Sequence, residues 1–167
     1  MKSSETIRLD DGREFTMRAL RKDDLDALER AFARLTADEI RFRLLEYARE
    51  LPRSIVAQVR KLDPERLVAF VIDDGGEIRA VADLHIEPPD AHEAEFGLIV
   101  GKAVSGLGLG RRLMARLLAE AHRRGITAVT GCVSAENARM LRLCRDLGGS
   151  IIPFATDLSL KTARFKP

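Results

Sequence analysis

The chain has 167 residues, of which 46% are hydrophobic and 32% are charged, and its net charge is +2. This length suffices for one substantial core, so we expect a single domain over residues 1–167, and the balanced charge argues against general nucleic-acid binding. The polar N-terminus, the lack of an apolar run of about twenty residues and two cysteines without CxxC or zinc spacing predict a cytoplasmic protein with no membrane span and no metal.

The chain begins with a predicted hairpin. Strand-like runs over residues 6–9 and 14–20 flank a turn in which Gly12 can take a positive φ. Apolar residues then recur at helical spacing after Asp23 or Asp24, either of which can cap the helix.

Two further helices are expected, one from about Ala37 and one after Pro52, each with an apolar stripe. The same region carries a basic face that we interpret as solvated, with a protein contact as the alternative. Its members are Arg41, Arg43, Arg49 and Arg53.

From residue 66 the pattern changes to short apolar runs separated by turn residues. Three antiparallel strands are the simplest interpretation, over residues 67–72, 78–86 and 94–100. A long helix with one apolar face follows and ends at Gly125. The remaining segments alternate as strand, helix, strand and strand, over residues 128–133, 138–147, 151–154 and 158–161. This order predicts a mixed α/β fold.

The most informative segment joins the third of those strands to the long helix. It places alternate glycines at positions 106, 108 and 110 before a helix that starts with Arg111 and Arg112. The first N–H groups of a helix lack partners and carry partial positive charge, and glycines let a backbone approach an anion. The spacing matches neither a Walker loop nor a dinucleotide fingerprint. We therefore expect a cradle for another phosphorylated cofactor, with a glycine-rich turn that binds nothing as the alternative.

This segment resembles the pyrophosphate-binding motif Gln/Arg-x-x-Gly-x-Gly/Ala of the GNAT superfamily of acyl-coenzyme A N-acyltransferases. Aligned on Gly108 and Gly110, the chain has Ser105 at the first position, which removes one long polar side chain from a cradle made mainly of backbone amides. The resemblance extends to the acetyltransferase domain of the bacterial protein-lysine acetyltransferase (Pat) family and covers roughly residues 9–152. The segments that carry it are residues 36–43, 94–100, 106–114 and 136–141.

The resemblance implies the GNAT fold, an α/β architecture with a mixed, mostly antiparallel central sheet flanked by helices. It also implies acetyl-CoA as the donor, an amine, foremost a protein lysine, as the acceptor, and no metal. Asn137 precedes a predicted helix and is expected to be its N-cap, in addition to the cofactor contact that the family implies. The expected cofactor-binding residues are Leu98, Val100, Ser105, Gly106, Leu107, Gly108, Leu109, Gly110, Arg111, Arg112 and Asn137.

Acetyl transfer to lysine requires a base, because an amine with a pKa of about 10.4 is mostly ammonium at pH 7. Glu95 is the candidate, since it lies in an otherwise apolar strand and the Pat-like family has a glutamate general base at the matching position. If the flanking strands pair as a hairpin, Glu95 lies beside His85 or Glu87. Burial or a neighbouring carboxylate would raise its pKa, and a charged histidine would lower it. The alternative is a solvated residue on an exposed strand face.

The chain departs from the family pattern at two further places. Cys144 stands where many members have a tyrosine that protonates the leaving thiolate, and we interpret it as an inert buried residue. Gly148 and Gly149 replace the usual Gly-Phe pair. A strand with alternating Asp83, His85 and Glu87 is interpreted as a polar face, with metal coordination as the alternative.

The expected mechanism is direct transfer in a ternary complex, with a backbone N–H near Leu98 stabilising the oxyanion. Two other function classes remain open. The first is a GNAT enzyme that acetylates a small-molecule amine, and the second is a non-catalytic acyl-CoA-sensing module.

Overall fold

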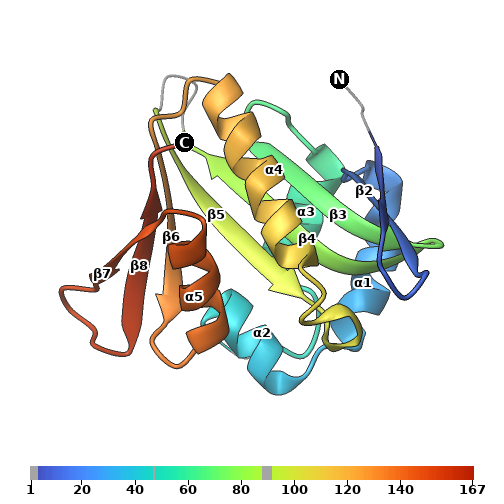
Figure 1. Cartoon of the computed structure of the whole chain (residues 1–167), viewed down its shortest axis with the longest axis horizontal. Coiled ribbons are helices and arrows are strands. Elements are labelled where there is room, and N and C mark those ends of the chain that lie inside the picture. The colour runs from blue at the N-terminus through green and yellow to red at the C-terminus, as the bar shows by residue number, and fades with distance from the viewer. Residues whose placement is uncertain (1–3, 47, 88–91) are drawn as a thin grey trace.

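The computed structural model describes residues 4–46, 48–87 and 92–167, which form one sheet with helices on both faces (Figure 1). Within these residues the sheet has eight strands in the order β1-β2-β3-β4-β5-β6-β8-β7. Every neighbouring pair is antiparallel except β5 and β6, which are parallel. The expected mixed, mostly antiparallel α/β fold is confirmed.

The elements follow the predicted order. The strands are β1 (Glu5–Arg8), β2 (Glu14–Ala19), β3 (Leu67–Asp74), β4 (Glu77–Ile86), β5 (Glu93–Val100), β6 (Ala128–Ser134), β7 (Ser150–Pro153) and β8 (Leu160–Phe165). The α-helices are α1 (Leu25–Ala33), α2 (Ala37–Leu44), α3 (Arg53–Lys61), α4 (Leu109–Arg123) and α5 (Ala138–Asp146). Two 3-10 turns are η1 (Lys22–Asp24) and η2 (Lys102–Val104). Among the described residues, no helix has both the length and the apolar character needed to span a membrane.

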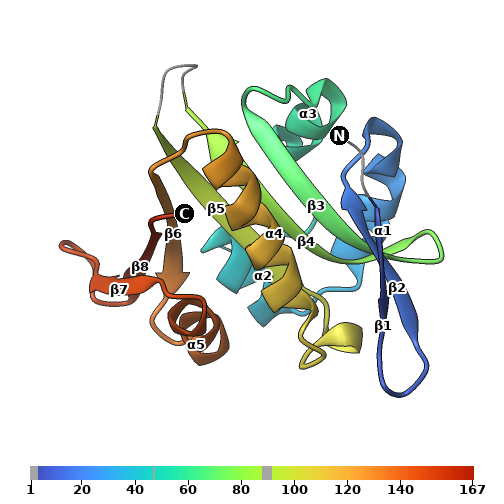
Figure 2. The same cartoon turned by 45° about the horizontal axis from the view of Figure 1, so that its top comes forward.

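The helices divide between the two faces of the sheet (Figures 1 and 2). On one face α4 packs against β3, β4 and β5, and α5 lies on the same side against β7. Leu113 and Leu117 of α4 are fully buried in this larger core. The opposite face carries α1, α2 and α3 over a smaller core that includes Val71 and Val59.

The start of α1 differs from the prediction. Asp24 occupies the N-cap position, but its carboxylate does not bond to the amides of α1. Instead it accepts hydrogen bonds from both terminal nitrogens of Arg18 at 2.7 and 2.8 Å, and Arg18 also bonds to Asp73 at 2.9 Å. Asp24 therefore pairs with a buried guanidinium, because leaving that charge unpaired would cost more free energy than leaving a helix end without a side-chain cap.

The last strand also differs from the prediction. Residues 158–161 were expected to form it, whereas β8 runs from Leu160 to Phe165 and lies between β6 and β7. Leu158 is 84% exposed, while Ala163 and Phe165 are buried in the larger core. Lysine, threonine and arginine interrupt the apolar residues of β8, so the strand lacks the continuous apolar run that marks β3.

The packing of α4 against the sheet generates a test of stability. Leu117 has no exposed surface, and Leu117→Ala is expected to lower the free energy of unfolding by about 3 kcal/mol because the deletion leaves a cavity. Leu158→Ala, the same chemical change at an exposed position, is expected to change it by less than about 0.5 kcal/mol. Denaturant unfolding followed by circular dichroism measures both values. Equal losses in the two variants would contradict this account of the core.

Candidate active site

The site starts where the parallel strands β5 and β6 separate. They pair through only three residues of each strand, ending at Glu95 and Thr130, although both strands continue. Phe96 follows Glu95, and its ring lies so close to Gly131 that a Cβ at this glycine would overlap the ring. The aromatic side chain thus packs over Gly131 on the face of the larger core, where its ring also meets that of Phe165 edge to face.

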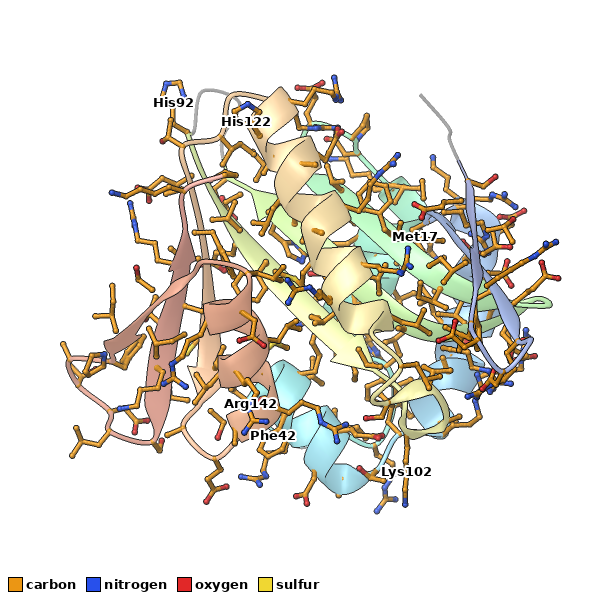
Figure 3. All side chains as sticks on the ribbon, in the orientation of Figure 1. Met17, Phe42, His92, Lys102, His122 and Arg142 are labelled. Carbon is orange, nitrogen blue, oxygen red and sulfur yellow. The ribbon has the colours of Figure 1, made fainter. Side chains whose placement is uncertain are left out.

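A cavity of about 290 Å³ lies beyond the divergence of the two strands. Leu98 and Val100 of β5 and Asn137, Met140 and Leu143 around α5 line it from the face that carries α4. The helix α2 lines it from the opposite side. Figure 3 shows the side chain of Phe42 reaching from α2 toward α5. The cavity therefore connects the two faces of the sheet.

The backbone of β5 offers a hydrogen-bond donor to this cavity. Gly101 donates its N–H to the carbonyl of Arg79 across the β4–β5 ladder at 2.9 Å. In an antiparallel ladder the bonded pairs alternate, so the pair of Ala82 and Leu98 is a non-bonded one. The N–H of Leu98 consequently points away from β4, toward the side where β6 has diverged.

The glycine segment forms a turn before α4. Gly106 and Gly108 have φ values of +80° and +77°, and the space where their Cβ atoms would lie is open. Gly108 is the N-cap of α4 and provides no side-chain bond to the first helical amides. Gly110 allows the first turn to pack on β5, because a Cβ there would lie 3.0 Å from a methyl group of Val100. Free amides at a helix N-terminus with open space in front fit an anion such as a pyrophosphate.

The remaining predicted loop residues do not all lie at the cavity. Leu109 is buried in the larger core, and the partly buried Leu107 packs against the same core. Their backbone groups, rather than their side chains, are therefore available to a cofactor. Arg112 is turned toward β1, where its guanidinium lies 3.4 Å from Glu5. Arg111 is exposed. Ser105 lines the cavity and accepts a hydrogen bond from the guanidinium of Arg139 in α5.

Arg139 of α5 is a residue that the sequence did not suggest. It donates a hydrogen bond to Ser105 Oγ and lines the same cavity. Asn137 is the N-cap of α5 as expected, with its Oδ1 accepting from Met140 N at 3.2 Å. Cys144 is buried, and burial raises the pKa of its thiol to about 11, which makes it a poor nucleophile or acid near pH 7.

Glu95 lies on the opposite face of β5 from Leu98 and is exposed rather than buried. It pairs across the ladder with His85, one of the two expected neighbours. Cys132 of β6 lies on the same side and is exposed as a residue. Partial burial of its thiol, together with the charges of Asp157 and Glu95, raises the pKa of that thiol. Neither Glu95 nor Cys132 is among the residues that line the 290 Å³ cavity.

An ion pair joins α2 to β4 beside the cavity. The Arg43 guanidinium bonds to both oxygens of Asp83, at 3.0 and 2.8 Å. It packs over Gly97, where an added Cβ would lie only 2.5 Å from a guanidinium nitrogen. His85 bonds to Asp83 at 2.9 Å. Burial of Asp83 opposes ionisation, but the charge of Arg43 and the bond from His85 outweigh it and lower the pKa of Asp83 to about 2. Arg43 is thus not the solvated residue expected from its position on a basic face.

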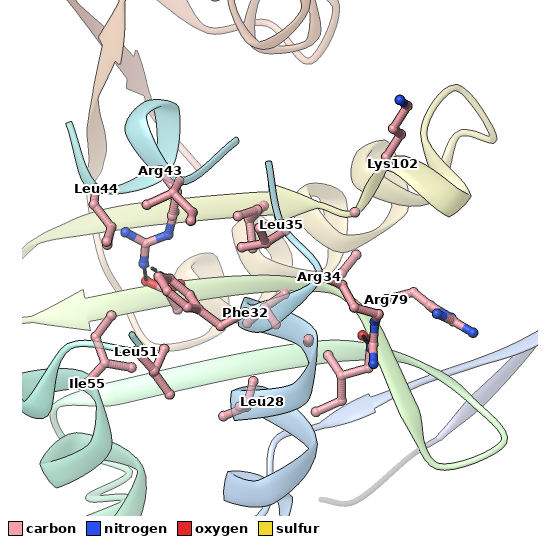
Figure 4. A pocket seen from close by; sticks show the side chains of 18 of the residues that line it. Leu28, Phe32, Arg34, Leu35, Arg43, Leu44, Leu51, Ile55, Arg79 and Lys102 are labelled. Carbon is pink, nitrogen blue, oxygen red and sulfur yellow. Dashed lines mark hydrogen bonds and ion pairs between the residues drawn. The ribbon is translucent and has the colours of Figure 1, made fainter. Parts of the chain in front are cut away.

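A second cavity of about 480 Å³ lies on the other side of α2, between the sheet and the helices α1 and α3 (Figure 4). Its walls are mainly apolar, with Leu28, Phe32 and Ile55 among them. Arg43, paired with Asp83, separates its inner end from the smaller cavity, which it also lines. Because that carboxylate is already paired, the larger cavity offers little to stabilise an ammonium group.

Metal coordination was the open alternative for the strand that carries Asp83 and His85. Within residues 4–46, 48–87 and 92–167, no group of three or more His, Cys, Asp or Glu side chains is arranged to hold a metal ion. The contacts of Asp83 with Arg43 and His85 account for its burial without a metal.

These features define a class of protein. A mixed sheet opens between two parallel strands, a glycine-rich helix N-terminus lies on one face, and the carboxylate of Glu95 lies on the other. This arrangement fits the class of acyl-coenzyme A N-acyltransferases.

Comparison with known proteins agrees with this class. The family model described as "Acetyltransferase (GNAT) family" matches residues 25–148. An acetyltransferase of Pseudomonas aeruginosa strain PAO1 is 30% identical over 143 residues, which cover 84% of this chain and 77% of that protein. The protein belongs to the GNAT family of acetyltransferases.

Solved structures share the fold. The GNAT domain of S. lividans PAT superposes with a TM-score of 0.87 at 21% identity, covering 98% of this chain and 97% of that one. The yncA protein from Salmonella typhimurium, solved with its cofactor acetyl-CoA, has a TM-score of 0.69 at 21% identity and covers 91% of this chain and 93% of its own.

The ion pair beside the cavity generates a prediction on stability and pH. Asp83→Asn is expected to lower the free energy of unfolding at pH 7 by about 3 kcal/mol, because it leaves a largely buried guanidinium without its charge partner. Since the pKa of Asp83 is lowered in the folded protein, the pair stabilises fully above the unfolded value near 4, and its contribution is lost as the pH falls toward about 2.

Denaturant unfolding between pH 7 and pH 2 measures the difference between wild type and variant. The exposed pair of Asp38 and Arg41 gives a matched control, because Asp38→Asn should cost less than about 1 kcal/mol. A difference for Asp83→Asn that does not shrink below pH 4 would refute the assigned ionisation.

Proposed function

We propose that this protein transfers the acetyl group of acetyl-CoA to a primary amine, with a protein lysine as the acceptor class, by direct attack in a ternary complex. The observation that carries the proposal is the cavity at the β5–β6 divergence, which is lined by α2 on one face of the sheet and by α5 on the other, beside the strand that carries the N–H of Leu98. Residues 1–167 would act as one catalytic domain. The cytoplasm is the proposed compartment, which two unpaired thiols, Cys132 and Cys144, support.

The donor side fits acetyl-CoA. The amides from Gly106 to Arg111 would bind the pyrophosphate, as the open space before these glycines allows. Leu98, Val100 and the first turn of α5 would bind the pantetheine arm along the cavity. Arg139 would bring a positive charge to the place where Ser105 lacks the long side chain of the family motif. The acetyl-CoA bound by the Salmonella relative supports this donor.

The acceptor side supplies a base and an oxyanion donor. Deprotonating a lysine amine at pH 7 costs about 4.6 kcal/mol, from 3.4 pK units at 1.36 kcal/mol each. Glu95 would take this proton as the amine approaches past it. The N–H of Leu98 would hold the carbonyl oxygen as negative charge develops on it, which lowers the barrier without a covalent enzyme intermediate. The buried Cys144 offers no acid, so the thiolate would take its proton from solvent.

A protein lysine is favoured because the acceptor face is open. Glu95 and Cys132 are both exposed, and a lysine side chain is long enough to reach past a surface residue while its own backbone stays outside. A small-molecule amine is the second candidate, favoured by the 480 Å³ cavity, which would accommodate an apolar substituent.

Binding of the donor is tested by calorimetry with acetyl-CoA. Gly108→Glu places a carboxylate before the proposed pyrophosphate cradle and is expected to weaken binding at least about 100-fold through repulsion and loss of the open space. Gly12→Glu is the matched control. It puts the same side chain at a glycine with φ of +89° and similar open space, in the hairpin between β1 and β2.

The control separates backbone strain from loss of the cradle, because both substitutions strain a left-handed residue. Equal affinity of wild type, Gly12→Glu and Gly108→Glu would show that the glycine segment does not bind the donor. Absence of acetyl-CoA binding by the folded wild type would refute the proposed function itself.

The role of Glu95 is tested with acetyl-CoA and a library of peptides that each contain one lysine, analysed by mass spectrometry. Glu95→Gln is expected to lower kcat about 100-fold near pH 7 while the affinity for acetyl-CoA stays the same, because the amide accepts no proton. Glu93→Gln, two residues away on the same strand, should keep full activity. Unchanged turnover in Glu95→Gln would remove Glu95 from the mechanism.

A further inference from the structure

A second proton-accepting group lies beside Glu95. Asp83 and His85 are next-but-one neighbours on β4, and a ring nitrogen of His85, Nε2, lies 2.9 Å from Asp83 Oδ1. The Asp83 side chain is only 11% exposed, whereas that of His85 is 33% exposed. A buried carboxylate thus holds an imidazole that remains accessible from the acceptor face.

The ionisation of Asp83 determines which tautomer of His85 is present. Arg43 and His85 hold Asp83 in its charged form, with a pKa of about 2, so its oxygens only accept hydrogen bonds. His85 must therefore donate from Nε2. In the neutral ring this leaves the lone pair on Nδ1 free to take a proton.

The register places this imidazole next to the proposed base. His85 and Glu95 are directly opposite on β4 and β5. Bonded and non-bonded pairs alternate along this ladder, and Gly101 with Arg79 is a bonded pair, so His85 and Glu95 are a bonded pair as well. In such a pair the Cα atoms are about 5.5 Å apart, and the two side chains leave the same face of the sheet. A side chain that reaches Glu95 therefore also reaches His85.

We propose that His85, oriented by Asp83, accepts the second proton of the acceptor amine at this site. The proposal rests on acetyl transfer at the β5–β6 cavity and adds a catalytic residue to it. An ammonium acceptor loses two protons in the reaction: Glu95 takes the first from the ammonium group, the imidazole takes the second from the nitrogen as it is acylated, and both then pass to solvent. The nitrogen–carbon bond forms as the carbon–sulfur bond breaks, and the departing thiolate takes up one proton from solvent.

The charges around the ring favour this role. Asp83 on the same strand contacts the ring, Glu95 on β5 lies directly opposite in the register, and Arg43 on α2 is neutralised by its pair with Asp83. The register neighbour on β3 is Leu67, which is uncharged, and Cys132 lies on β6. His85 thus lies between two carboxylate residues on one face of the sheet, one buried and one exposed.

The first test is nitrogen NMR of the imidazole, which needs no acceptor. The chain has three histidines, and Figure 3 shows the other two, His92 and His122, at one end of the molecule, so His92→Gln and His122→Gln assign the spectrum. We expect neutral His85 to carry its proton on Nε2 in the wild type. In Asp83→Asn the amide can donate to Nε2, and the proton should move to Nδ1.

The second test is kinetic, with poly-L-lysine as the amine probe and release of the coenzyme thiol as the signal. His85→Gln should lower kcat about 100-fold and remove the wild-type acidic limb of the pH profile, while the calorimetric affinity for acetyl-CoA is unchanged. Asp83→Asn should lower kcat through the wrong tautomer. His122→Gln should behave as wild type. Added imidazole should restore part of the activity of His85→Gly, which a purely structural role would not allow.

The outcomes separate this proposal from the proposed function. A neutral His85 with its proton on Nδ1, or a His85→Gln variant with wild-type kcat and pH profile, overturns the role of His85 and leaves acetyl transfer intact. Loss of acetyl-CoA binding in the wild type overturns both. If poly-L-lysine is not acetylated, the tautomer measured by NMR decides.

Discussion

The separation of β5 from β6 is the constraint on which the rest of the site depends. A parallel ladder would ordinarily continue as far as both strands extend, but here it stops at Glu95, and the ring of Phe96 packs over Gly131 just beyond that point. Two consequences follow from the divergence of the strands. A cavity opens through the sheet, and the N–H of Leu98 has no strand partner in front of it. Donor and acceptor can then meet without passing over an edge of the sheet.

The position of α2 depends on a second, electrostatic constraint. A short helix with only one buried residue, Ile40, cannot be held by apolar packing alone. The bidentate pair of Arg43 with Asp83 ties it to β4, and Gly97 is required because any side chain there would displace the guanidinium. Burying two charges is costly, so the pair is better understood as fixing the place of α2 than as adding net stability. That place determines the wall between the two cavities.

The sequence predicts what depends on local pattern. The helical stripes, the hairpin at Gly12 and the N-cap at Asn137 are determined by neighbours within a few residues, and the structure confirms them. Contacts between distant residues are not visible in this way. Nothing in the spacing of Arg43 indicates that it will meet Asp83, forty positions later, and the same holds for Arg139 and Ser105. The strand β8 begins later than the pattern predicts, because Lys161, Thr162 and Arg164 interrupt its apolar residues.

This difference explains why the donor is easier to infer than the acceptor. The proposed donor side consists of backbone amides, whose presence follows from a glycine pattern and a helix start and is insensitive to the loss of one side chain at Ser105. The proposed acceptor side consists of side chains of β4, β5 and β6, brought together by the register of the sheet. Glu95, His85 and Cys132 acquire their common face only when the three strands pair. A change of one residue in that register would turn each of them to the core, so the acceptor chemistry is a property of the whole sheet rather than of any single motif.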